Sequence, residues 1–270
     1  MKTSTSIVVL ALLSTGCATL FPQAAPVERA VAQALITDQQ EAQLGLQVHE
    51  QLQKEQAKFN TNPKVQAYVD GIARRIVGAA DRDRPGVGWK LFVIDEGKTA
   101  NAFATPGGRI YVYTGLLLAA RNEAEIAGVL GHEMGHVVAR HTARQLVAAK
   151  GLEVVAGMAL GQQPNQIAAL TAALAGKGTM LAYGREMERE SDNYGVKYAA
   201  AAGYDPDALA TFFEMLQSKG DVPELLAFLS THPPSAERVR NIRQTIAQTG
   251  AKGSDLGADR LAAIRAELGP

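Results

Sequence analysis

The chain has 270 residues with no formal net charge, and 47% of its residues are hydrophobic while 20% are charged. This composition can bury a substantial core, which excludes an intrinsically disordered chain. The neutral charge balance provides no basic surface of the kind that binds nucleic acid, so we expect no nucleic-acid partner.

The N-terminus is typical of an export signal. Lys2 precedes the run IVVLALLSTGC, whose apolar part is too short to span a bilayer. The ending LSTGC resembles a bacterial lipoprotein signal, and its Cys17, the only cysteine in the chain, would be the lipidated residue. We expect a signal peptide over 1–16, a lipidated tether over 17–36 and one domain over 37–270. The alternative is simple secretion without lipidation.

Capping residues and apolar spacing predict two helices after the tether. Thr37 or Asp38 can cap the first helix, and Asn62-Pro63 starts the second. Three segments typical of strands follow, with β-branched and aromatic residues and a Pro-Gly-Gly turn: WKLFVID, NAFATPGG and GGRIYVYTG.

Helices dominate the rest of the chain. We predict one long helix from Arg121 to about Lys150, capped by Asn122, and an Ala- and Gly-rich segment over 151–182. That segment is either a helical hairpin packed on the core or a mobile lid. Further helices are expected near 185–202, 206–219, 235–248 and 256–268. Strands early and helices late indicate a single α+β domain that is mainly helical.

The sequence HEMGH fits the H-E-x-x-H pattern of zinc peptidases. Positions i and i+4 of a helix lie on one face, so His132 and His136 can bind one ion. Imidazole nitrogens suit zinc, and Glu133 beside them is a candidate general base. His141 lies nine residues after His132, about 180° around a continuous helix. We therefore predict that His141 is not a ligand.

A catalytic zinc usually has three protein ligands, so a third ligand must come from elsewhere. The segment REMERESDNYG contains four acidic residues. Helical spacing places Glu190 on a wholly polar stripe that we expect to face solvent, whereas Glu188 and Asp192 lie on the opposite stripe among small residues. We predict Glu188 as the third ligand. Asp192, one turn later, can accept the second ring N–H of a ligating histidine.

Four motifs together resemble one family: NAFATPGGRIYVYTGLL, GHEMGHVVARH, YGREMERESDNYG and THPPSAERV. The chain resembles the HtpX/CAAX-prenyl-protease family of zinc metallopeptidases, and looks most like its soluble, exported bacterial branch. The resemblance implies a zincin-type (gluzincin) fold whose ligands are two histidines and the glutamate of E-x-x-x-D. These positions correspond to His132, His136 and Glu188, with Asp192 behind them.

The resemblance also implies two roles outside the ligand set. In zinc peptidases of the thermolysin kind an Asn-Ala edge strand holds the substrate, which makes Asn101 and Ala102 the candidates here; a plain core hairpin is the alternative. A histidine in the position of His232 lies near the metal in the family. His232 would then either donate to the oxyanion or keep the zinc occupied until it is displaced.

The sequence therefore predicts an exported zinc endopeptidase in the periplasm, attached to the outer membrane through Cys17. Its expected partners are protein or peptide substrates, especially unfolded or misassembled envelope proteins, with the outer-membrane assembly machinery as a further candidate. The rival hypothesis is a chaperone or assembly factor that holds clients without cutting them. Glu133 argues against it, since a pure binder has no need of that base.

Overall fold

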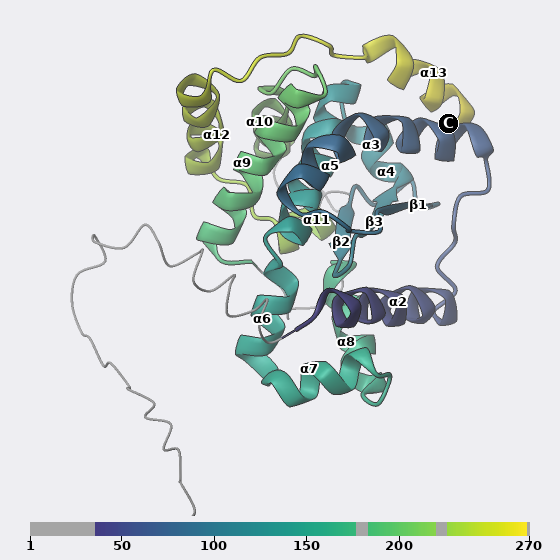
Figure 1. Ribbon diagram of the computed structural model, residues 1–270. Helices are drawn as coiled ribbons and strands as arrows, with labels where there is room; N and C mark the ends of the chain where they lie inside the picture. Colours follow the sequence, from purple (N-terminus) through teal and green to yellow (C-terminus); the bar gives the residue numbers. More distant parts are fainter. Residues whose placement is uncertain (1–35, 177–182, 220–225, 269–270) are drawn as a thin grey trace, which may run out of the picture.

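The computed structural model describes residues 36–176, 183–219 and 226–268 and shows a mainly helical fold with one small sheet (Figure 1). The predicted signal peptide and Cys17 lie outside the described residues. Within the described ranges, no helix combines the length and the apolar character needed to cross a membrane. The predicted α+β class is confirmed.

The sheet has three strands in the order β1-β3-β2. Strand β1 (Lys90–Ile94) pairs in parallel with β3 (Arg109–Tyr113), and β2 (Ala102–Thr105) pairs with β3 in the antiparallel sense. All three predicted strands are confirmed. Among the described residues β2 pairs with one strand only, so it is an edge strand, as the resemblance implied.

Alternating side chains divide the sheet into two different faces. One face contributes small aliphatic side chains to the larger hydrophobic cluster, and the other contributes mainly aromatic side chains to a second cluster. The first set is Leu91, Val93, Ala102, Ala104, Ile110 and Val112; the second is Phe92, Ile94, Phe103, Tyr111 and Tyr113. The rings of Phe103 and Tyr111 stack with centroids 4.7 Å apart.

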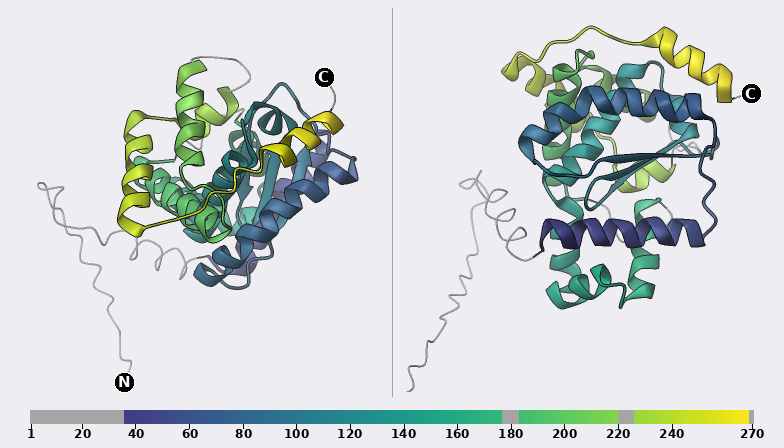
Figure 2. Two further views of the ribbon diagram at one scale, coloured as in Figure 1. Left: turned by 90° about the horizontal axis from the view of Figure 1, so that it is seen from above. Right: turned by 45° about the vertical axis from the view of Figure 1, so that its right-hand side comes forward.

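Helices cover both faces of the sheet. In the right-hand view of Figure 2, α3 (Pro63–Asp83) crosses one side of the strands and α2 (Asp38–Lys54) crosses the other. Below α2 lie α7 (Leu152–Ala159) and α8 (Pro164–Leu174), which pack against it. The predicted helical hairpin is therefore confirmed over these two helices, while 177–182 lie outside the described residues.

The first two helices begin where their capping residues predicted. The Thr37 hydroxyl accepts the N–H of Gln40 at 3.1 Å, and the Gln40 side chain accepts the N–H of Thr37 at 2.9 Å. This reciprocal capping box satisfies two backbone donors at the start of α2. Asn62 accepts the N–H of Lys64 at 3.0 Å at the start of α3, with Pro63 in the first turn.

Helices α5 (Glu123–Val138) and α9 (Arg185–Ala201) make the most extensive helix contact of the described fold. Small residues on both helices permit it. A Cβ added at Gly131 would lie 3.1 Å from the Cα of Gly195, so the two backbones meet with no side chain between them. This close approach brings the H-E-x-x-H helix beside the acidic helix.

The prediction of one long helix from Arg121 to Lys150 is wrong. Helix α5 ends at Val138, Arg140 has φ 60° in the left-handed region, and a separate helix, α6 (His141–Lys150), follows. Asn122 does cap α5, accepting the N–H of Glu125 at 3.0 Å.

Tertiary contacts explain this break. A left-handed conformation costs an ordinary residue roughly 1–2 kcal/mol. Arg140 is buried, forms an ion pair with Glu41 at 3.2 Å and donates to the carbonyl of Ile36. Arg84 donates to the carbonyl of Val137 at 2.6 Å and pairs with the same Glu41. These contacts offset the strain of the left-handed conformation at Arg140. The partners of Arg140 lie more than 90 positions away in the sequence.

The remaining predicted helices are confirmed, with small shifts at their ends: α9, α10 (Ala208–Lys219), α12 (Ala236–Thr249) and α13 (Ala258–Leu268). Two short helices were not predicted, namely α4 (Thr114–Ala119) and α11 (Leu226–Thr231). Each has six residues, which is too short to show a helical period.

Candidate metal centre

Two histidines of α5 form the first part of the candidate centre. His132 and His136 lie one turn apart, and their Nε2 atoms are 3.0 Å from each other. Both side chains are buried at the contact with α9. The helix therefore presents both nitrogens to one point, as the spacing of the motif predicted.

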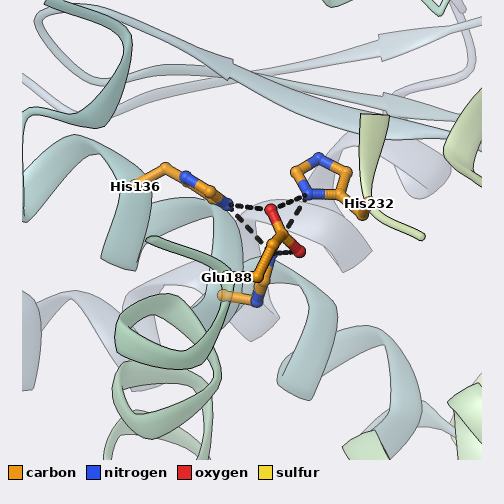
Figure 3. A group of neighbouring side chains, drawn as sticks. His136, Glu188 and His232 are labelled. Atoms are coloured by element: carbon orange, nitrogen blue, oxygen red, sulfur yellow. Dashed lines mark hydrogen bonds and ion pairs between the residues drawn. The ribbon is translucent and has the colours of Figure 1, made fainter. Parts of the chain in front are cut away.

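Glu188 of α9 and His232, directly after α11, complete a cluster of four donors (Figure 3). Glu188 Oε1 lies 3.4 Å from His136 Nε2 and 3.0 Å from His232 Nδ1. One atom from each of the four side chains lies within 4.8 Å of the other three. The structure thus brings together the three predicted ligands and places His232 among them.

Glu133 lies at the edge of this cluster. Its Oε2 accepts the backbone N–H of Ala104 on β2 at 2.9 Å, and its Oε1 lies 3.3 Å from His232 Nε2. The base candidate is therefore held between the sheet edge and the cluster rather than pointing into solvent.

Each histidine of α5 has a partner at its second ring nitrogen. His132 Nδ1 lies 2.9 Å from Asp192 Oδ1, the contact expected from the sequence. His136 Nδ1 lies 2.9 Å from His141 Nδ1, and His141 Nε2 lies 3.1 Å from Glu190 Oε2. Such partners fix the orientation of a ligating ring.

These contacts correct two expectations, one about His141 and one about Glu190. His141 does not point away from the cluster, because the chain turns at Arg140 and brings its ring back against His136. Glu190 does not face solvent freely, because it contacts His141 and lies 3.7 Å from Arg144. Neither residue belongs to the four-donor cluster.

The electrostatics suit a metal-binding group. Burial lowers the pKa of His136 well below its ordinary value, so its ring is a neutral donor. Burial alone would raise the pKa of Glu188, but the charge of His232, hydrogen bonds from His136 and His232, and Arg238 together hold that pKa well below the usual range. Burial raises the pKa of Glu133, the direction that favours a general base.

Three features show that these residues fit a divalent ion. The donor set is imidazole nitrogen and carboxylate oxygen, the set that zinc accepts in catalytic sites. Glu133 Oε1 is buried without a hydrogen-bond partner in the described structure. Three buried carboxylates, of Glu133, Glu188 and Asp192, lie at this site, and the buried guanidinium of Arg238 contacts two of them, so the acidic groups outnumber the guanidinium, as a site for a divalent cation requires.

The predicted substrate strand borders the same site. The N–H of Tyr113 bonds the carbonyl of Asn101 at 3.0 Å, so the alternating ladder turns the main-chain groups of Ala102 and Ala104 toward the free edge of β2. Both polar atoms of the Asn101 side-chain amide are buried without a hydrogen-bond partner among the described residues. Asn101 and Ala102 are themselves fully buried in this conformation.

A cavity of about 300 Å³ adjoins the cluster between α9 and α12. Its lining includes Tyr183, Glu188, Arg189, Pro233 and Arg238. It therefore lies against the candidate ligand Glu188 and the loop that follows His232.

Sequence reasoning missed two residues of the site. The ring of Tyr183 lies 4.0 Å from that of His136, and its hydroxyl is 2.8 Å from Thr142 Oγ1. Arg238 is buried against Glu188 and Asp192. Tyr183 lies in the motif YGREMERESDNYG and Arg238 in THPPSAERV, so membership of these motifs was the signal that could have found them. Neither residue has a spacing to the other site residues that indicates a role.

Comparison with known proteins places this site in context. A model of peptidase family M48 matches residues 62–246. The chain is 32% identical over 186 residues to the mitochondrial metalloendopeptidase OMA1 of Schizosaccharomyces pombe, covering 68% of this chain and 54% of that protein. It is 31% identical over 220 residues to the beta-barrel assembly-enhancing protease of Escherichia coli (strain K12), covering 76% of this chain and 43% of that protein. The chain thus spans about half the length of these relatives or less.

Proposed function

Because the chain belongs to peptidase family M48, we propose that it is a zinc-dependent endopeptidase that hydrolyses unfolded or misassembled proteins of the bacterial cell envelope. The observation that supports this most directly is the buried convergence of His132, His136 and Glu188 next to Glu133. The family supports metal-dependent peptide hydrolysis, and the donor chemistry supports zinc.

His132, His136 and Glu188 would hold the ion. Zinc in such a set supplies Lewis acidity, which makes water a better nucleophile near neutral pH and polarises a carbonyl. Asp192 and His141 orient the two imidazoles through their second nitrogens.

Glu133 would act as the general base and then as the general acid. It takes a proton from the attacking water and passes that proton to the leaving amine. The N–H of Ala104 holds Oε2, which leaves Oε1 to handle the proton. Its raised pKa brings the carboxyl closer to the pH at which both transfers are efficient.

Asn101 and Ala102 would bind the substrate as an added strand. The main-chain groups of Ala102 point to the free edge of β2, and the buried side-chain amide of Asn101 offers N–H donors and a carbonyl acceptor to a peptide backbone. Recognition of this kind depends on the backbone more than on side chains, so the enzyme would cut many sequences. Only an unfolded segment can add as a strand, which supports unfolded proteins as the substrates.

His232 would block the centre in the conformation described here. Its Nδ1 lies 3.0 Å from Glu188 Oε1 and 3.3 Å from His132 Nε2, so it is one of the four converging donors. It would compete with water and substrate for the ion until the loop that begins at His232 moves. The burial of the whole cluster supports an idle state. The alternative role is donation to the oxyanion from the displaced loop.

The cellular setting is also a proposal. The N-terminal pattern supports export and lipidation of Cys17, with the domain at 37–270 facing the periplasm from the outer membrane. A protein contact in the envelope would add to the attachment that the lipid provides. The Escherichia coli relative is named a beta-barrel assembly-enhancing protease, and this name supports the outer-membrane assembly machinery as a partner of the chain.

Removal of zinc tests the proposed function. We expect the purified protein with one zinc per chain to cleave unfolded casein, to lose this activity with 1,10-phenanthroline and to regain it when zinc is added, because the ion supplies the chemistry that the side chains lack. Cleavage is followed by gel and by released peptides. Casein that binds to the zinc-loaded protein and stays intact would support the chaperone hypothesis instead.

Replacing His232 with alanine is expected to raise the rate of casein cleavage several-fold, because the donor that competes for the ion is removed. Zinc content is measured alongside, and it should stay at one per chain. A large loss of activity in zinc-loaded His232→Ala would instead assign the residue to oxyanion stabilisation.

A further inference from the structure

Arg238 is a buried cation at the back of the candidate metal centre. It lies in the first turn of α12, where Ser235 Oγ accepts its backbone N–H at 3.1 Å and so fixes the start of the helix. The side chain points to α9 and is 7% exposed. Its guanidinium lies over the ring of Phe213, with Cζ 4.2 Å from the ring centroid.

The guanidinium joins two carboxylates of α9. Glu188 and Asp192 are four residues apart on one helix face, an arrangement in which like charges repel. Arg238 Nε and Nη2 donate to the two oxygens of Asp192 at 2.8 and 2.6 Å. Arg238 Nη1 lies 2.7 Å from Glu188 Oε2. One planar group thus contacts both acids from a single side.

We propose that Arg238 is a positioning residue of the metal centre, whose forked guanidinium fixes the orientation of the ligand Glu188 and of the His132 partner Asp192. This inference rests on the proposed function, because it concerns the ion that the function requires.

The atoms that Arg238 contacts decide which atoms remain for the ion. On Glu188 it pairs with Oε2, which lies 3.7 Å from His132 Nε2, while Oε1 is the oxygen nearest to His136 Nε2 and His232 Nδ1. On Asp192 it holds both oxygens in one plane, with Oδ1 2.9 Å from His132 Nδ1. Rotation of either carboxylate would break an Arg238 contact, so two of the three ligands depend on this side chain.

The same guanidinium reaches the loop that follows His232. Arg238 Nη1 donates to the carbonyl of Pro233 at 3.2 Å. Arg238 is therefore a common contact of Glu188, of Asp192 and of Pro233, the residue next to the proposed blocking residue His232. We expect the contact with Pro233 to hold the loop while the centre is idle.

Shape rather than charge is the property that this role requires. A guanidinium presents donors in a rigid plane that matches two carboxylate oxygens, whereas an ammonium is a point charge on a flexible stem. Lysine in place of Arg238 would keep the positive charge and lose the fork. A charge effect and a positioning effect thus predict opposite results for this substitution.

The test measures zinc affinity on the full chain by competition with a chromophoric chelator. We expect Arg238→Lys and Arg238→Gln both to weaken zinc binding about 10–100-fold, the range found for changes to the partners of metal ligands. Arg243→Lys is the matched control: Arg243 lies on the same helix and pairs with Asp207 and Glu214 at the surface, so its replacement should leave the affinity unchanged.

Cobalt provides a second reading that a general loss of stability would not change. The visible absorption of Co²⁺ depends on ligand geometry, so we expect the bands of Arg238→Lys to shift relative to those of Arg243→Lys. All proteins are compared at a temperature at which circular dichroism shows them fully folded.

Arg238→Lys with wild-type zinc affinity and an unshifted cobalt spectrum would overturn the inference, whether or not Arg238→Gln is impaired. That outcome would leave the proposed function intact. Failure of the wild-type chain to bind zinc would contradict the proposed function itself, so the two failures are distinguishable.

Discussion

Glu133→Gln is expected to reduce casein hydrolysis by about two to four orders of magnitude, the usual contribution of a general acid–base group. Glutamine keeps the shape of the side chain and can still accept the N–H of Ala104, but it cannot take a proton from water. The loss should therefore appear in kcat, with zinc content and melting temperature close to those of the wild type.

The substitution is best made in two backgrounds, the wild-type chain and His232→Ala. If His232 holds the wild type idle, the second background gives the larger signal from which to measure the loss. Hydrolysis that continues undiminished in Glu133→Gln, in either background, would refute the role of Glu133 and with it the proposed mechanism.

The second large effect concerns the third ligand. We expect Glu188→Gln to lose zinc and all activity. The fall in zinc affinity should exceed the ~10–100-fold that is typical when a hydrogen-bond partner of a metal ligand is replaced. Glu188 Oε1 lies 3.4 Å from His136 Nε2 within the four-donor cluster, so no other acid of α9 can replace it there. Zinc per chain is measured after dialysis by atomic absorption.

Glu190→Gln is the matched control, since Glu190 lies on the same helix two positions away. Its carboxylate contacts the ring of His141, which in turn contacts the proposed ligand His136. The variant should keep one zinc per chain. If Glu190→Gln lost zinc while Glu188→Gln retained it, the assignment of ligands would have to be exchanged.

Local signals predicted most of the elements. The cap at Thr37, the Asn62-Pro63 start and the aromatic strands around β3 each depend on residues within a few positions of one another. Helical spacing likewise placed His132 with His136, and Glu188 with Asp192, because each pair is four residues apart on one helix. The period of a helix is a property that sequence alone contains.

The end of α5 could not be predicted in this way. Ala139 and Arg140 have good helix propensity, so nothing local indicates a break. The break depends on Glu41 and Ile36, which lie about a hundred positions earlier. The position of His141 followed from the continuous helix and was wrong for the same reason. Arg238 was missed because its partners lie on another helix.

The hydrogen bond between Ala104 and Glu133 fixes the distance between the proposed base and the place where the substrate would bind. Strand β2 would bind the peptide at Ala102 and holds the base at Ala104, two residues or about 7 Å further along. One residue inserted between Ala102 and Ala104 would lengthen the distance from Ala102 to Glu133 by the rise of one residue along the strand. It would also turn the main-chain N–H and C=O groups of Ala102 toward β3. The length of this strand is therefore constrained by the distance from the scissile bond to the proton acceptor, independently of what the sheet needs for its stability.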